Sequence, residues 1–115
     1  MILVSLQKNV FGELVFAASR GHSEAVKTGV DPVCTAVSLM FYAVSAGFFD
    51  VPGLTLDVSA PEKGDFSLRV LDSRASLKEL LKFSYDFLLK GFRKLESSFP
   101  ENLKLELLPV VKTVF

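Results

Sequence analysis

The chain has 115 residues, half of them hydrophobic, which suits a single domain with one core over residues 1–115. Thirteen basic and thirteen acidic side chains give a formal net charge of zero, which argues against direct nucleic-acid binding through a basic surface. No uninterrupted apolar run reaches the ~18 residues that cross a membrane, so we expect no membrane contact.

Two short segments at the start of the chain have the pattern of strands. Residues 2–7 and 13–19 are rich in apolar side chains and are joined by KNVFG, which contains residues typical of a turn. We expect Leu14, Phe16 and Ala18 to share one face of the second strand, because successive side chains in a strand point to opposite faces.

A polar loop follows from 21 to 30, and a helix is expected to begin at Asp31. Aspartate is a good N-cap residue, and Pro32 falls at the first helical position, where its missing N–H costs nothing. We expect the helix to end near Gly47 and to bury apolar side chains spaced three and four residues apart. These side chains are Val33, Ala36, Val37, Met40 and Val44.

The second half of the chain also begins with two strand patterns that precede a helix. Residues 54–59 and 66–70 alternate between apolar and polar side chains, and the linker APEKGD between them is typical of a hairpin. Ser76 and Glu79 form a capping-box pattern that opens a long second helix, and residues 103–107 predict a last strand. The order β-β-α-β-β-α-β predicts an α+β fold, a two-layer sandwich of two helices on a mainly antiparallel sheet.

The only histidine and the only cysteine, His22 and Cys34, are separated by twelve positions around the predicted helix start. With Asp31 as the N-cap, Cys34 is the third helical residue, where unsatisfied N–H groups and the helix dipole favour a thiolate. The same N–H groups could hold a developing oxyanion. If Gly21 and Gly29 let the loop bend back over the helix start, His22 reaches the sulfur and acts as its base.

Both residues also have an ordinary structural explanation. A lone cysteine beside alanine and valine is often a small core residue, and a lone histidine on a loop is often a surface residue. One histidine, one cysteine and scattered carboxylates lack the closely spaced ligand pairs of a zinc site, so we expect no metal and no cofactor. The residues alone leave the catalytic and the structural explanation of Cys34 open.

The stretch GHSEAVKTGVDPVCTAVS resembles the signature of the bacterial ribosomal-processing cysteine protease family Prp, and the predicted order of elements is similar to the fold of that family. The resemblance implies a cysteine endopeptidase that removes the N-terminal extension of a large-subunit ribosomal protein, the twenty-seventh. It also implies that Cys34 is the nucleophile and His22 the general base. The sequence departs from the signature at Ser23, Pro32 and Thr35. The matching residues are Gly21, His22, Gly29, Asp31, Val33, Cys34, Ala36, Val37 and Ser38.

The resemblance further implies a homodimer and a mobile loop between the histidine and the cysteine. Phe83 and Phe87 lie off the main stripe of the second helix, where they either face that partner or widen the buried face. Asp31 is the nearest candidate to orient the histidine, although capping competes for its carboxylate. Ser38, one turn after the cysteine, either lines the site or bonds its own backbone.

Two other functions remain open at this point. A dimeric module that binds ribosomal protein or the assembling ribosome without cutting would have much the same sequence. A redox-sensing thiol protein is the second, since a low-pKa cysteine oxidises easily, but with no second cysteine it needs an intermolecular disulfide or a glutathione cap. A single cysteine and a start without signal-peptide features favour a cytoplasmic location.

Overall fold

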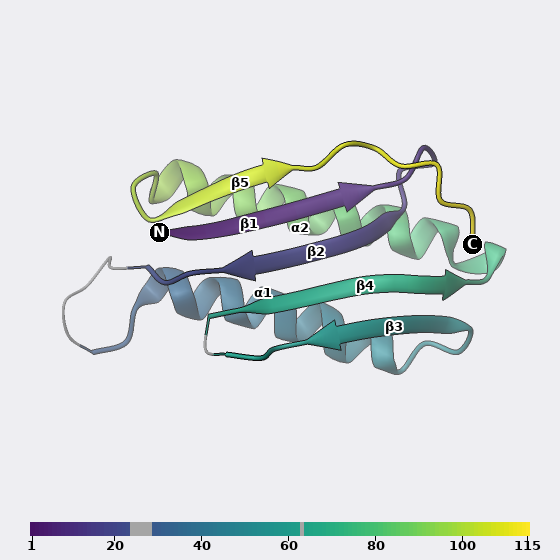
Figure 1. Ribbon diagram of the computed structural model, residues 1–115, viewed down its shortest axis with the longest axis horizontal. Coiled ribbons are helices and arrows are strands. Elements are labelled where there is room, and N and C mark those ends of the chain that lie inside the picture. Colours follow the sequence, from purple (N-terminus) through teal and green to yellow (C-terminus); the bar gives the residue numbers. More distant parts are fainter. Residues whose placement is uncertain (24–28, 63) are drawn as a thin grey trace.

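The computed structural model describes residues 1–23, 29–62 and 64–115 and has two layers, a five-stranded sheet with two helices on one face (Figure 1). The predicted α+β class and the predicted order of elements are confirmed. The elements are β1 (Ile2–Lys8), β2 (Leu14–Arg20), α1 (Pro32–Phe49), β3 (Leu54–Ser59), β4 (Phe66–Ser73), the short 3₁₀ helix η1 (Ala75–Leu77), α2 (Lys78–Ser98) and β5 (Leu103–Leu107).

The strands lie in the order β3-β4-β2-β1-β5 across the sheet. Neighbouring strands are antiparallel except β1 and β5, which are parallel. A parallel pair needs a crossover, and α2 supplies it by running back along the sheet before β5 begins (Figure 1). The tail after β5 stays beside β1, where the Leu108 N–H donates to the Leu6 carbonyl at 2.9 Å.

Aromatic rings join the two layers at the centre of the core. Phe41 of α1 lies with its ring centroid 4.6 Å from that of Phe66 on β4 and 5.2 Å from that of Phe92 on α2. Phe92 and Leu88 of α2 are completely buried. This cluster fixes the position of α1 over β4, and therefore the position of the residues at the start of α1.

The buried face of α1 differs from the predicted stripe. Val33 and Val37 are buried as predicted, but Met40 and Val44 are only half-buried at the edge of the core. The helix is rotated so that Phe41, rather than Met40, points between the sheet and α2. The buried residues are Val33, Val37, Phe41, Ser45 and Phe48.

By length and composition alone, α1 could cross a membrane, with a mean hydropathy of 1.6 over 18 residues. The expectation of no membrane contact relied on uninterrupted apolar runs, and a mean over the helix is a different criterion that a few small polar residues lower only slightly. An apolar helix that covers a core passes the same test, and α1 buries one face against the core.

The prediction that Phe16 and Ala18 share a face of β2 with Leu14 is wrong. The register with β1 shifts at the start of β2, and this β-bulge leaves Leu14 and Val15 both buried. Beyond the bulge Ala17 is buried, whereas Phe16 and Ala18 are half-buried on the other side of the sheet. One extra residue reverses the alternation that the sequence suggests.

The predicted capping box of the second helix is also wrong. The 3₁₀ helix η1 precedes α2, and the Leu77 N–H closes it by donating to the Arg74 carbonyl at 3.0 Å. Leu77 is consequently the N-cap of α2, and no side chain caps that start. Ser76 lies inside the 3₁₀ turn, one position too early to act as the cap.

Candidate active site

The start of α1 is fixed by Asp31. This residue has the extended backbone of an N-cap, and its Oδ1 accepts hydrogen bonds from the Val33 N–H at 2.9 Å and the Cys34 N–H at 3.1 Å. Pro32 occupies the first helical position. The predicted cap is confirmed, and it places Cys34 in the first turn of the helix.

The same cap contradicts one detail of the predicted chemistry. The N–H groups expected to hold an oxyanion donate instead to the Asp31 carboxylate, in the case of Val33 and Cys34, and to the Asp31 carbonyl at 3.0 Å, in the case of Thr35. Pro32 has no N–H. A good N-cap satisfies the donors of the first turn, so an oxyanion would need donors from another segment.

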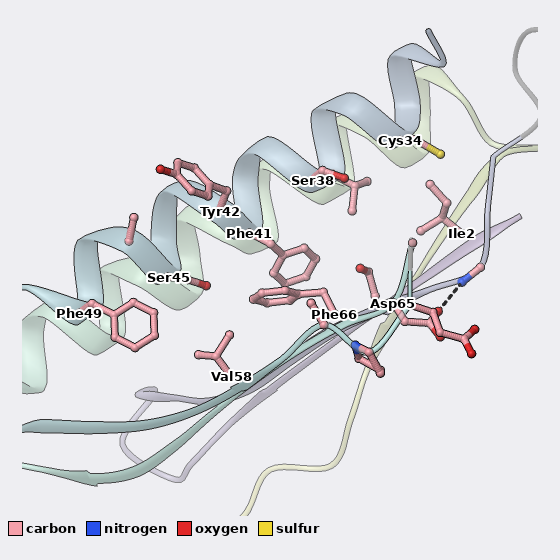
Figure 2. A pocket seen from close by; sticks show the side chains of 18 residues that line it. Ile2, Cys34, Ser38, Phe41, Tyr42, Ser45, Phe49, Val58, Asp65 and Phe66 are labelled. Carbon is pink, nitrogen blue, oxygen red and sulfur yellow. Dashed lines mark hydrogen bonds between the residues drawn. The ribbon is translucent and has the colours of Figure 1, made fainter. Parts of the chain in front are cut away.

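The thiol of Cys34 meets one such donor. Cys34 is half-buried, and the backbone N–H of Ser23 donates to its Sγ at 3.3 Å. Figure 2 shows the sulfur near the start of α1, on the side of the helix that faces the strands. This contact holds the sulfur beside the backbone of the segment that carries His22.

The contact between Ser23 and sulfur also brings His22 close to the thiol. The Ser23 nitrogen is bonded to the carbonyl carbon of His22, and that carbonyl accepts a hydrogen bond from the Met1 amino group at 2.7 Å. The imidazole is exposed and lies against Gly64, where a Cβ would stand 2.7 Å from its Cε1 and 2.9 Å from its Nδ1. Within the described part of the chain, no hydrogen bond joins this imidazole to the thiol. The predicted pair therefore shares one end of the site with the ring turned towards Gly64.

The loop between β3 and β4 contributes two residues that sequence reasoning missed. Asp65 accepts a hydrogen bond at its Oδ1 from the Gly21 N–H at 3.4 Å (Figure 2). Gly64 has a φ of +90°, and a Cβ there would come within 2.7 Å of the Gly21 carbonyl oxygen. Glycine is what allows this close approach. The APEKGD linker was assigned only as a hairpin, and nothing in the sequence says which loop its tip touches.

The remaining predicted residues lie as follows. Ser38 is exposed and lines the same cavity as Cys34. Gly29 is exposed with a φ of +84° and open space around the position of a Cβ. Most of the loop expected to move over the helix start, residues 24–28, lies outside the described residues.

A cleft of about 640 Å³ runs from Cys34 along α1. It separates α1 from the β3–β4 hairpin, and apolar side chains such as Val37, Phe41 and Phe66 form much of its lining (Figure 2). Phe49 lies at the far end, fifteen residues after Cys34. At 1.5 Å of rise per residue this is roughly 22 Å, the length of about six or seven residues of extended peptide.

The described residues give no evidence of a metal site at this cleft. Among the residues whose placement is described, no three histidine, cysteine, aspartate or glutamate side chains are grouped so that they could hold a metal ion. What the site offers is a thiol at a helix start, a nearby imidazole and a long apolar groove. These are the parts needed for covalent attack on a peptide.

Comparison with known proteins gives a family and a set of similar folds. The model of the family described as Cysteine protease Prp matches residues 1–104. A search of curated proteins finds no match. Two S. aureus structures of an essential ribosomal processing protease Prp are similar to this chain. One carries a covalently linked product peptide, with 20% identity and a TM-score of 0.79. The other carries a substrate peptide, with 19% identity and a TM-score of 0.73. Both alignments cover 94% of this chain and 100% of the other.

A third similar structure is a Streptococcus mutans protein, with 22% identity and a TM-score of 0.70, covering 94% of each chain. At these identities the solved structures establish the fold. The family match covers nine-tenths of the sequence, including both His22 and Cys34.

Proposed function

Because this chain belongs to the cysteine protease Prp family, we propose that it is an endopeptidase in which Cys34 is the nucleophile and His22 the general base. Its proposed substrate is the N-terminal extension of the twenty-seventh large-subunit ribosomal protein. The observation that carries the proposal is the position of the thiol, in the first turn of α1 at the end of a cleft long enough for a peptide.

Two observations support a peptide as the substrate. The cleft takes about six or seven extended residues along α1, and β3 is an edge strand of the sheet beside it. A peptide in such a place is bound by apolar pockets and by backbone hydrogen bonds to a strand edge. The S. aureus proteins of similar fold are described with a substrate peptide and with a covalently linked product peptide. This supports the same use of the cleft here.

The proposed reaction follows the chemistry of a thiol and an imidazole. The Sγ of Cys34 attacks the scissile carbonyl carbon while His22 takes the thiol proton, and the tetrahedral intermediate collapses as the C–N bond breaks. His22 gives that proton to the leaving amine. Water, deprotonated by His22, then hydrolyses the thioester. The Ser23 nitrogen, 3.3 Å from Sγ, carries an N–H that lies close to where the oxyanion forms.

The proposal requires one rearrangement. The His22 imidazole lies against Gly64 and must turn towards Sγ, a movement that an exposed side chain makes by rotation about its own bonds. The backbone of His22 need not move, since its carbonyl is held by Met1 and the next nitrogen already contacts sulfur. Binding of a peptide in the cleft is the event that we expect to favour the turned ring.

We also propose that the protein is a cytoplasmic homodimer that uses α2 as part of its interface. Phe83 and Phe87 are 67% and 48% exposed, and their rings stack with centroids 6.1 Å apart. They border a hollow of about 290 Å³ between α1 and α2, lined also by Val44 and Phe48. Replacement of both phenylalanines by serine should convert a dimer to a monomer in sedimentation equilibrium; an unchanged mass would contradict this interface.

Alkylation of the thiol tests the catalytic pair and separates it from the other functions. The rate at which Cys34 reacts with iodoacetamide at neutral pH should fall in the His22→Ala variant, because the proposed base that takes the thiol proton is missing. Equal rates in both proteins would remove His22 from the proposal. A thiol that is unreactive at neutral pH, in a protein that still binds the ribosomal peptide, would indicate the binding module.

A further inference from the structure

Ser45 has an unusual environment on α1. It is 6% exposed, lines the cleft, and its hydroxyl has no hydrogen-bond partner among the described residues. Figure 2 shows the hydroxyl on the side of α1 that faces the strands. A buried polar group without a partner destabilises the folded protein. The unpartnered hydroxyl of Ser45 therefore needs an explanation.

Another serine in the same fold shows the ordinary alternative. Ser84 of α2 is equally buried at 6%, and its hydroxyl donates to the Leu80 carbonyl one turn earlier at 2.7 Å. A helical serine satisfies its hydroxyl in this way without help from outside the helix. Ser45 does not make that bond, so its buried hydroxyl has no partner at the wall of the cleft. Rotation about the Cα–Cβ bond is the movement that would turn it towards a group bound there.

The distance of Ser45 from Cys34 determines which residue of a bound peptide it would contact. It follows Cys34 by eleven residues, which is about 16 Å along the helix axis. An extended peptide covers that distance in about five residues. Between the two positions the cleft is lined by apolar side chains, including Val37 and Phe41. A polar group that enters here would find the Ser45 hydroxyl as its partner in an otherwise apolar stretch.

We propose that Ser45 is a specificity-determining residue that hydrogen-bonds an uncharged polar side chain of the substrate, an amide or a hydroxyl, about five residues from the scissile bond. An uncharged group fits because one hydroxyl cannot compensate the burial of a charge in an apolar cleft. An amide or hydroxyl both donates and accepts, as serine does. This inference rests on the proposed function, since it requires that the cleft bind the peptide that Cys34 cuts.

The test is a set of substrate peptides in which each position from four to six residues on either side of the scissile bond carries glutamine or the similarly shaped methionine. The wild-type protein should cut the glutamine peptide about tenfold faster in kcat/KM at one of these positions. Ser45→Ala should lose that preference to within about twofold. Ser84→Ala is the matched control and should keep it.

A second readout comes from the free protein. Ser45→Ala removes an unpartnered buried hydroxyl and should raise the Tm by a few degrees, whereas Ser84→Ala breaks a hydrogen bond and should lower it. If Ser45 had only a structural role, Ser45→Ala would lower the Tm and leave the peptide preference unchanged.

The outcomes separate this inference from the proposed function. Cleavage with no glutamine preference at any of these positions, or with a preference that survives in Ser45→Ala, overturns the role of Ser45 alone. If no peptide is cut, binding of the same peptides to the Cys34→Ala variant is measured by fluorescence anisotropy. If Cys34→Ala binds the glutamine peptide more tightly and the double variant with Ser45→Ala does not, Ser45 recognises the peptide although the protein is not a protease. No binding would overturn both.

Discussion

Gly64→Ala tests whether the hairpin loop positions His22, the proposed general base. The new Cβ would lie 2.7 Å from the Gly21 carbonyl oxygen and 2.7 Å from Cε1 of His22. Ordinary contact begins near 3.4 Å, so each neighbour must retreat by about 0.7 Å, the difference between these two distances. The His22 ring can turn away from the new Cβ, as the proposed reaction itself requires. The Gly21 contact is with backbone, so the segment that carries His22 has to move.

The expected magnitudes differ for stability and for activity. Alanine at a φ of +90° costs about 1–2 kcal/mol of backbone strain, which lowers the free energy of unfolding by about that amount. Misplacement of a catalytic group by about 1 Å costs up to about 100-fold in rate. We therefore expect kcat/KM for peptide cleavage to fall by about 10- to 100-fold.

Gly12→Ala is the matched control. Gly12 has a φ of +82°, and the nearest atoms to its Cβ would be those of the Lys82 side chain at 3.7 and 3.8 Å, an ordinary contact. This variant carries the same backbone strain in the turn between β1 and β2, away from the cleft. Both variants should lose stability in urea unfolding, and Gly64→Ala should lose more because of its two close contacts. Only Gly64→Ala should lose activity. Equal activity of the two variants would refute the argument that Gly64 positions His22.

Two further predictions concern the helix start and the core. Asp31→Ala removes the cap of α1 and should lower stability by about 1 kcal/mol, or about 4 °C in Tm, whereas Asp31→Asn should keep most of that stability; equal losses in thermal melts would show that the cap is not the cause. Burial raises the pKa of Tyr85 above its ordinary value of 10.0. The neutral phenol is thus favoured in the folded state, and its contribution to stability is present below pH 10 and lost as pH rises through the raised pKa. The Tm of the wild-type protein should fall more steeply above pH 10 than that of Tyr85→Phe, and parallel curves would contradict this assignment.

Local chemistry made part of the fold predictable. Asp31 and Pro32 mark the start of α1 because a cap and a missing N–H act within one turn. The alternation in β3 and β4 is visible because those strands are regular in the segments that were predicted. The start of α2 was misplaced at Ser76, since a 3₁₀ turn and a capped helix start share the same residues in sequence.

Contacts between distant segments could not be predicted. The rotation of α1 depends on the rings of Phe66 and Phe92, which belong to two other elements. The bulge in β2 depends on the register with β1. In the site, the sequence placed His22 and Cys34 on facing segments, but the contacts of Gly64 and Asp65 with that loop arise only when the hairpin packs beside it.

The oxyanion donors illustrate a conflict between two local rules. A helix start offers free N–H groups to an anion, and a good N-cap consumes them. The sequence showed both features at Asp31, and the structure shows that the cap takes the Val33 and Cys34 donors. The Ser23 N–H at the sulfur was not foreseen, because it depends on how the histidine segment passes over α1.

The most direct test of the central claim is cleavage of the ribosomal protein by the wild-type protein and by Cys34→Ala, followed by intact mass. The source organism's twenty-seventh large-subunit ribosomal protein is used with its native N-terminus. We expect one N-terminal cut made only by the wild-type protein, while Cys34→Ala keeps the same circular dichroism spectrum and makes no cut. A cut made equally well by Cys34→Ala would contradict the assignment of Cys34 as the nucleophile.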